Sequence, residues 1–318
     1  MPDISRIVVL DDYQQVASSY ADWGRLGAEV DFVGEHLLGE DLVRRAAGAQ
    51  VVVAMRERTV LDAPLLDRLE DLRLLVTTGA ANASIDVAHA RARGVTVCGT
   101  RSRPGPAAEL TWALIHAVLR DVPQADRTVR EGGWQDVLPG TDLAGSTLGV
   151  VGLGRLGQRV ARVGLAFEME VLAWSQNLDP DVATAMGVVP TTKEDLLARS
   201  DVVSLHLKLS ERTRGVLGVA ELAQMKPGAV LVNTSRGPLV DEQALVAALR
   251  AGSLGGAGLD VYDEEPLPAD HPLRSTPRTV LTPHLGYVTD PNYRLFYGDA
   301  VEDVLAWLSG SPVRVLEP

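Results

Sequence analysis

The stretch TLGVVGLGRLGQRVARVGL, residues 147–165, decides the fold of this chain. A buried-strand pattern runs directly into three glycines, and a helical pattern follows them. In such a unit the first glycine allows a tight turn and the second lets the backbone approach a pyrophosphate. The third lets helix and strand pack closely. Gly152, Gly154 and Gly157 therefore predict a dinucleotide-binding loop, with a tight turn that binds no ligand as the alternative.

Strand and helix patterns alternate on both sides of this unit, which is typical of parallel sheets. Before residue 99 the predicted strands are 6–10, 51–54, 72–76 and 95–98, with a helix over 84–93. After it they are 147–151, 170–174, 201–205, 229–233, 256–260 and 279–283, and a long helix follows residue 288. The fold class predicted is α/β, with six strands in the second part completing a doubly wound sheet.

Composition narrows the classes of function. With 46% apolar and 23% charged residues, the chain of 318 residues is typical of soluble globular proteins. Its net charge of −12 argues against binding nucleic acid or an anionic membrane. Cys98 is the one cysteine, which excludes an internal disulfide and a cysteine-rich metal cluster, and we expect no metal site. The first residues lack a signal-peptide profile and no apolar run reaches about 18 residues, so a cytoplasmic location is expected.

Three polar residues follow predicted strands in the second part. Arg236 comes after 229–233, Asp260 ends 256–260, and His284 comes after 279–283. Each alone would most often be a loop or structural residue. The carboxyl ends of parallel strands share one edge, however, where ligands bind. An arginine there can bind a carboxylate in a bidentate manner, and a histidine oriented by a carboxylate can transfer a proton.

The motifs GLGRLG, DVVSLHL, MKPGAVLVNTSRGPLVDEQAL, GLDVYDEEPLP and LTPHLGY occur in this order. With them the chain resembles the D-isomer-specific 2-hydroxyacid dehydrogenase family, whose members include glyoxylate/hydroxypyruvate reductases and phosphoglycerate dehydrogenases. The resemblance covers nearly the whole chain and is clearest over 105–290. It implies a Rossmann cofactor domain, residues 99–288, inserted in a flavodoxin-like substrate domain made of 1–98 and 289–318. It also implies a homodimer formed through the cofactor domain, with the segment around Trp134 embracing the partner.

The resemblance also implies roles for individual residues. Arg236 would bind the substrate's carboxylate and carbonyl oxygen, and His284 would be the general acid in reduction. Glu265, rather than Glu264 or Asp263, would hold His284 and keep it protonated. Asp260 would bond to the nicotinamide carboxamide. The implied cofactor contacts are Gly152, Gly154, Arg155, Leu156, Gly157, Ser175, Gln176, His206, Thr234, Asp260 and Gly286.

Three stretches depart from the family pattern. Gly79, Ala80, Ala81 and Asn82 fill the loop expected to bind the substrate carboxylate, so the identity of the substrate stays open. Lys208 replaces a common proline and is most simply a solvated lysine. Ser175–Gln176–Asn177 replaces the acid that would bond the ribose of NAD and repel the 2′-phosphate of NADP. Either cofactor is therefore predicted, with a slight preference for NAD.

The function predicted is hydride transfer between NAD(P)H and a small anionic 2-keto or 2-hydroxy acid. Oxidation of formate or phosphite in the same fold is disfavoured, because the formate branch has glutamine where Glu265 stands. An alternative of another class is a nucleotide-sensing binding protein, like the corepressor branch of this family, without significant turnover. That branch can retain Arg236, Glu265 and His284, so these residues do not exclude it.

Overall fold

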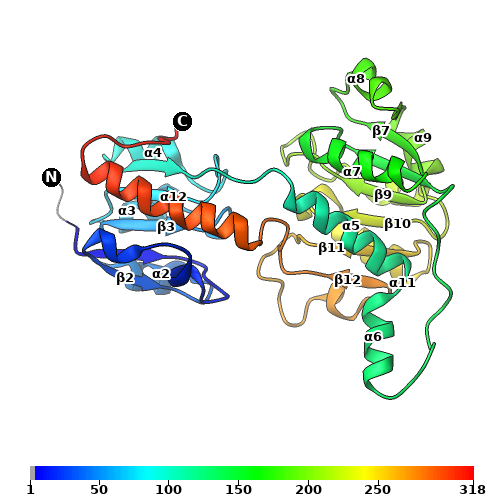
Figure 1. The fold of residues 1–318 in the computed structure, drawn as a ribbon, viewed down its shortest axis with the longest axis horizontal. Coiled ribbons are helices and arrows are strands. Elements are labelled where there is room, and N and C mark those ends of the chain that lie inside the picture. Colours follow the sequence, from blue (N-terminus) through cyan, green and yellow to red (C-terminus); the bar gives the residue numbers. More distant parts are fainter. Residues whose placement is uncertain (1–3) are drawn as a thin grey trace. The chain divides into compact units, whose positions relative to one another are not determined.

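The computed structural model describes residues 4–318; residues 1–3, the beginning of the expected substrate domain, lie outside the described part. The chain forms two compact units (Figure 1). The first runs to Arg103 and resumes over Val288–Pro318, and the second is Pro104–Tyr287. Residues 99–103 thus group with the first unit, five residues beyond the boundary expected from the sequence. The Arg101 guanidinium explains this, because it bonds to Asp299 in the same unit at 2.6 Å.

The first unit is built on a five-stranded parallel sheet of order β2-β1-β3-β4-β5. This is the flavodoxin-like order expected. β3 and β4 are buried along their whole length, as central strands of a covered parallel sheet should be. The sequence missed the edge strand β2, whose residues are exposed or half-buried. The strands are β1 Arg6–Val9, β2 Glu29–Phe32, β3 Val51–Ala54, β4 Leu74–Thr77 and β5 Thr96–Gly99.

Helices complete the first unit. The last of them, α12 (Asp290–Leu308), contacts β4 and α1, and buries Phe296, Tyr297 and Val304. After it, the chain returns along the free edge of β5, where Leu316 N donates to Val97 O at 2.8 Å. The other helices are α1 Ala17–Tyr20, η1 Trp23–Leu26, α2 Gly39–Ala46, α3 Ala63–Arg68 and α4 Val87–Ala92.

The second unit contains a seven-stranded parallel sheet of order β12-β11-β10-β9-β6-β7-β8. The sequence predicted six strands and missed β8, which is only two residues long at the edge. Strand order reverses between β6 and β9, and ligands of open α/β sheets bind outside the carboxyl ends at such a point. The strands are β6 Thr147–Val151, β7 Glu170–Trp174, β8 Val189–Pro190, β9 Val202–Leu205, β10 Val230–Asn233, β11 Gly256–Leu259 and β12 Thr279–Leu281.

Helices cover both faces of this sheet. One apolar layer includes Leu196, Leu222 and Leu245 from α9, α10 and α11. The other includes Ile115 from α5 and Val160 from α7, so the sheet is doubly wound. The expected α/β class is therefore confirmed. The helices are α5 Pro106–Leu119, α6 Val122–Arg130, α7 Arg155–Ala166, α8 Pro180–Ala185, α9 Lys193–Arg199, α10 Val219–Gln224, η2 Gly237–Leu239, α11 Glu242–Arg250 and η3 Pro272–Ser275.

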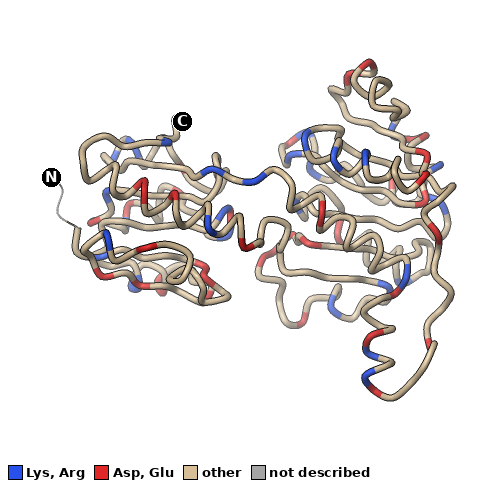
Figure 2. Tube along the Cα trace, in the orientation of Figure 1, with Lys and Arg blue, Asp and Glu red and all other residues tan. Residues whose placement is uncertain are grey.

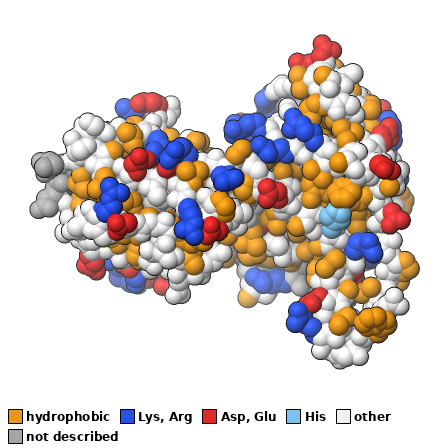
Figure 3. Space-filling model, viewed as in Figure 1, with side chains coloured by type: hydrophobic (Ala, Val, Ile, Leu, Met, Phe, Trp, Pro, Cys, Tyr) orange, Lys and Arg blue, Asp and Glu red, His pale blue; other side chains and the backbone are white. Residues whose placement is uncertain are grey.

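Charged residues of both signs are distributed over each unit (Figure 2). Exposed arginines gather over α7, where Arg155, Arg159 and Arg162 lie on its outer face (Figure 3). Within residues 4–318, none of the helices combines the length and apolar character needed to cross a bilayer. The same residues contain no group of three or more His, Cys, Asp or Glu side chains placed to hold a metal ion.

Candidate active site

The glycine loop joins β6 to α7 at the point where strand order reverses. Gly152 has φ +102°, and a Cβ there would lie 2.8 Å from the backbone of His206. A Cβ on Gly157 would lie 2.0 Å from the carbonyl oxygen of Gly152, so neither position accepts a larger residue without backbone movement. Gly154, in contrast, faces open space directly before the α7 N-terminus. The loop 152–157, called the glycine cradle below, therefore fits a dinucleotide pyrophosphate.

His206 is the first residue after β9, next to this loop. Its backbone N–H donates to Val151 O at 2.8 Å, and its Nε2 lies 2.9 Å from Ser204 Oγ. Burial lowers the pKa of His206 to about 4, so the imidazole is neutral at pH 7. His206 therefore places a neutral ring beside the cradle. Of the other predicted contacts here, Leu156 is half-buried and Arg155 is exposed.

The turn after β7 begins at Ser175, where the acid of an NAD-preferring site would stand. Ser175 is half-buried, and Gln176 and Asn177 are exposed. The side-chain Nε2 of Gln176 donates to the carbonyl oxygen of Arg212 at 3.4 Å. The turn is thereby connected to the loop that follows β9, a contact that the sequence did not predict.

Arg236 follows β10, and its backbone is fixed by its neighbours. The side chain of Asn233 accepts from Ser235 N at 3.0 Å and donates to Arg236 O at 2.8 Å. Ser235 Oγ donates to Leu205 O at 2.7 Å, which ties the segment to β9. The next residue, Gly237, is so close to Tyr262 that a Cβ would lie 2.0 Å from its carbonyl carbon. Arg236 is half-buried at the carboxyl edge of the sheet.

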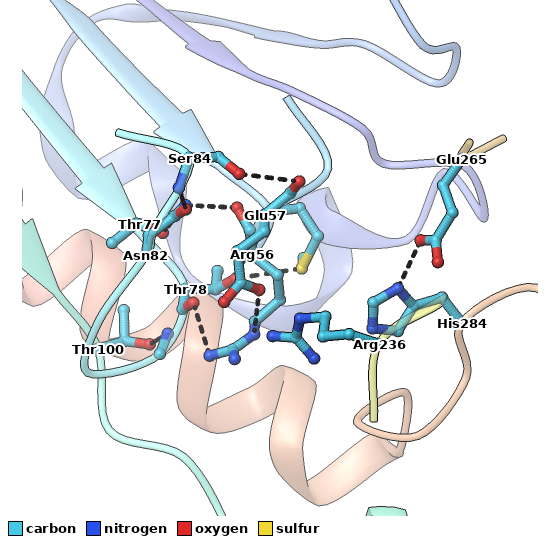
Figure 4. Close-up of polar contacts among 12 residues, drawn as sticks. Arg56, Glu57, Thr77, Thr78, Asn82, Ser84, Thr100, Arg236, Glu265 and His284 are labelled. Atoms are coloured by element: carbon cyan, nitrogen blue, oxygen red, sulfur yellow. Dashed lines mark hydrogen bonds and ion pairs between the residues drawn. The ribbon is translucent and has the colours of Figure 1, made fainter. Parts of the chain in front are cut away.

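His284 and Glu265 form a direct pair (Figure 4). The Nδ1 of His284 lies 2.6 Å from Glu265 Oε2, and Glu265 Oε1 accepts from Tyr262 N at 2.9 Å. His284 has φ +54°, and its N–H donates to Asp260 O at 2.9 Å. Glu264, the neighbouring acid, is exposed. Because Nδ1 is engaged by the carboxylate, Nε2 is the ring atom left to exchange a proton with a substrate.

The ionisation of Glu265 follows from its surroundings. Burial alone would raise its pKa, but the hydrogen bond and positive charge of His284 oppose this effect. The N–H of Tyr262 and the charge of Arg236 act in the same direction, and together they hold the pKa of the Glu265 carboxyl below its usual value. Glu265 is therefore ionised at neutral pH, as a carboxylate that stabilises an imidazolium must be.

Asp260, which the resemblance assigns to the nicotinamide carboxamide, is fully buried. Its carboxylate accepts from Thr282 Oγ1 at 2.6 Å, Leu285 N at 2.7 Å and Gly286 N at 2.8 Å. Burial raises its pKa, while these donors oppose the shift. The carboxylate thus holds the segment 282–286 that carries His284. This supporting contact was not anticipated from the sequence.

Thr234 also makes a contact that the sequence did not reveal. Its Oγ1 lies 2.8 Å from Thr111 Oγ1, and both side chains are buried. Thr111 Oγ1 donates to the carbonyl oxygen of Ala107 at 2.8 Å. The one feature of the sequence that could have indicated this contact is Thr111 itself, a polar residue within the apolar run of α5.

The predicted substrate loop belongs to the first unit and follows β4 (Figure 4). Gly79 has φ +96°, its N–H donates to Thr100 Oγ1 at 2.7 Å, and Thr100 N donates back to Gly79 O at 2.9 Å. At the other end of the loop, Asn82 Nδ2 donates to Thr77 Oγ1 at 2.9 Å. Between these anchors, Ala80 and Ala81 are exposed. Arg56 Nη1 donates to Thr78 O at 3.3 Å, so a cation missed by the sequence analysis lies beside the loop.

The stretch DDY after β1 forms a second polar cluster in the first unit. Asp11 is buried, and its carboxylate pairs with His36 Nδ1 at 2.9 Å and Thr59 Oγ1 at 2.6 Å. Its carbonyl oxygen accepts from Arg58 Nη1 at 2.9 Å, and the guanidinium of Arg58 lies 4.6 Å from the centre of the Tyr13 ring. Asp11 therefore fixes the position of Arg58 at the carboxyl edge of this sheet.

Comparison with known proteins bears on this arrangement. The family model described as "D-isomer specific 2-hydroxyacid dehydrogenase, NAD binding domain" matches residues 112–286. A glyoxylate reductase of Aeropyrum pernix is 38% identical over 85% of this chain and 83% of its own length. A D-3-phosphoglycerate dehydrogenase of Archaeoglobus fulgidus is 35% identical over 97% of this chain, which spans only 58% of that longer protein.

A solved structure of a putative D-3-phosphoglycerate dehydrogenase oxidoreductase from Ralstonia solanacearum shares the fold with a TM-score of 0.92. It is 37% identical, and the similarity covers 98% of this chain and 97% of that one. The matched domain supports a nicotinamide dinucleotide as cofactor. The resemblance drawn from the motifs is thereby confirmed, and the chain belongs to the D-isomer specific 2-hydroxyacid dehydrogenase family.

Proposed function

We propose that the protein interconverts small 2-keto acids and D-2-hydroxy acids, with Arg236, His284 and Glu265 as its catalytic residues. The observation that carries this proposal is the 2.6 Å contact between His284 Nδ1 and Glu265 Oε2, on the sheet that carries the glycine cradle. A charged, carboxylate-held imidazole is suited to protonate the oxygen of a carbonyl that is being reduced.

Each residue has a defined task in reduction. Arg236 binds the substrate carboxylate and polarises the carbonyl through its paired N–H donors. His284 gives its Nε2 proton to the developing alkoxide, and Glu265 stabilises the imidazolium before that transfer. The nicotinamide, when bound, supplies the hydride. In the direction of oxidation His284 takes the hydroxyl proton, and the same carboxylate stabilises the charge that results. This proton transfer contributes about 10²–10⁴ to the rate.

For the substrate carboxylate we propose the loop at Gly79, Ala80 and Ala81 as a further binding segment. Its support is the rigid anchoring of Gly79 by Thr100 and the exposure of the two alanines. For the cofactor we propose the contacts implied by the family, including Arg155, Ser175, Gln176, His206, Thr234 and Gly286. The turn after β7 by itself slightly favours NAD, because it provides no cation for a 2′-phosphate.

The proposal is tested by mixing the protein with NADH or NADPH and a panel of glyoxylate, hydroxypyruvate, pyruvate and phenylpyruvate. Loss of the reduced cofactor's absorbance with at least one keto acid is expected, and the D-enantiomer of the product should support the reverse reaction. Tight cofactor binding without turnover on any member of the panel would instead favour the alternative function, a nucleotide-sensing binding protein.

We further propose a homodimer formed through the second unit. Its support is the segment that follows α6, where Trp134 is 77% exposed and Leu138 is 76% exposed. Large apolar side chains this exposed are typical of contact surfaces. Sedimentation of the protein, compared with a Trp134→Asp/Leu138→Asp variant, tests this: the wild type should sediment as a dimer and the variant as a monomer. The cytoplasmic location expected from the sequence stays a prediction.

A further inference from the structure

Two loops meet at the predicted adenosine end of the cofactor site. The first is the turn 175–177 after β7, and the second is the loop 206–214 after β9. β6 lies between β7 and β9 in the sheet, yet Gln176 Nε2 reaches Arg212 O at 3.4 Å. The loops therefore approach each other across the carboxyl end of β6, where the glycine cradle begins.

The second loop is held in shape by its own hydrogen bonds. Thr213 Oγ1 donates to Lys208 O at 2.7 Å and accepts from Ser210 N at 2.8 Å. Arg214 N donates to Ser210 O at 2.9 Å. A loop closed in this way presents Arg212 from a defined backbone position, so less conformational entropy is lost when its side chain binds a ligand.

The cations near the two loops differ in whether a carboxylate pairs with them. Lys193, whose Nζ lies 5.8 Å from the centre of the Trp174 ring, is paired with Glu221 at 2.7 Å. Arg212 is exposed and has no carboxylate partner within residues 4–318. The turn 175–177 contains no acid that could compete for it. In a chain of net charge −12, an unpaired guanidinium beside this turn is a candidate anion contact.

We propose that Arg212 binds the 2′-phosphate of NADP(H), so that the protein accepts NADP(H) as well as NAD(H). The guanidinium can bind two phosphate oxygens at once, which gives both charge and geometry for this group. Ser175 and Gln176 are neutral and can bond to a ribose hydroxyl when no phosphate is present. The slight preference for NAD was predicted from the turn 175–177 alone, and Arg212 in the second loop was not part of that prediction. This inference rests on the proposed cofactor site.

The test uses two nucleotides that differ only in the 2′-phosphate, adenosine 2′,5′-bisphosphate and AMP, titrated calorimetrically into the full-length protein. We expect the bisphosphate to bind about tenfold more tightly, the low end of the range for charged hydrogen bonds, because Arg212 is exposed to solvent. Arg212→Ala should abolish this difference and leave the affinity for AMP unchanged. High salt should shrink the difference in the wild type.

The matched control is Lys208→Ala, which removes the same charge from the same loop. It should keep most of the preference, and Arg212→Lys should keep part of it. Ser175→Asp should reverse the preference, since an acid there repels the 2′-phosphate.

Equal affinities of the two nucleotides for the wild type, or equal losses in Lys208→Ala and Arg212→Ala, would overturn the role of Arg212 and leave the proposed function intact. Failure of both nucleotides to bind would overturn the cofactor site itself and the inference with it.

Discussion

Replacing Gly237 by alanine should disable catalysis through a steric effect on the neighbouring Arg236. The new Cβ would lie 2.0 Å and 2.1 Å from the carbonyl carbon and oxygen of Tyr262, and 2.5 Å from Asp263 N. These are all backbone atoms, so no side-chain rotation relieves the contact. Ordinary contact begins at 3.4 Å, and the two segments must therefore separate by more than about 1 Å.

Both segments position residues of the proposed catalytic set, because Arg236 precedes Gly237 and the N–H of Tyr262 holds Glu265. A misplacement of about 1 Å costs about 10² in rate, and we expect kcat/KM for the best keto acid to fall by about that factor. Overpacking of this kind should also lower the free energy of unfolding by about 1–3 kcal/mol. Steady-state kinetics and urea unfolding measure the two effects.

Gly298→Ala is the matched control, since a Cβ there meets nothing within 4 Å and the residue lies inside α12. It should leave kcat/KM unchanged and stabilise the protein by up to about 1 kcal/mol. AMP should bind the wild type and both variants equally, because the new methyl on residue 237 does not meet the glycine cradle. A Gly237→Ala variant that keeps kcat/KM within threefold would refute the reasoning.

Arg236→Lys should lower kcat/KM at least about 100-fold on every accepted keto acid, because a point charge cannot replace a bidentate donor pair; near-normal turnover would show that the role is wrong. Glu265→Gln should restrict keto-acid reduction to lower pH, whereas Glu264→Gln should keep the wild-type pH–rate profile, and identical profiles would contradict the pairing with His284. Burial raises the pKa of Asp303 to about 7 despite its contact with Arg314, so the stability this carboxyl contributes is present at low pH and is lost as pH rises through about 7. Urea unfolding between about pH 5 and pH 8 should show a loss of up to about 3 kcal/mol from this group in the wild type and none in Asp303→Asn; parallel curves would exclude the effect.

The central part of the fold could be predicted from the sequence, and its margins could not. β3 is apolar along its whole length and β10 up to its last residue, Asn233, and the glycines after β6 fix the transition from strand to helix. β2 and β8 lie at sheet edges, where half of the surface is solvated and the hydrophobic pattern fades. α6 carries five polar residues among nine, so its hydrophobic pattern is also weak, and it was missed for that reason.

In the candidate site, the positions of residues could be predicted from the sequence, but their side-chain contacts could not. Residues that follow parallel strands are brought to one edge by topology, so Arg236 and His284 could be placed from the strand pattern alone. The direction of a side chain depends on tertiary contacts. That is why the burial of Asp260 against the segment 282–286 and the contact of Gln176 with Arg212 were not foreseen.

The burial of α12 in the first unit has a consequence for biosynthesis. Phe296 and Tyr297 are almost completely buried, and the helix packs against β4, a strand made more than 200 residues earlier on the ribosome. The second unit, Pro104–Tyr287, is continuous in sequence, and its last residue is translated before this helix begins. Domains fold as units during synthesis. The second unit should therefore mature first, while the sheet that begins the chain waits, with an apolar surface exposed to chaperones, for the last helix to arrive.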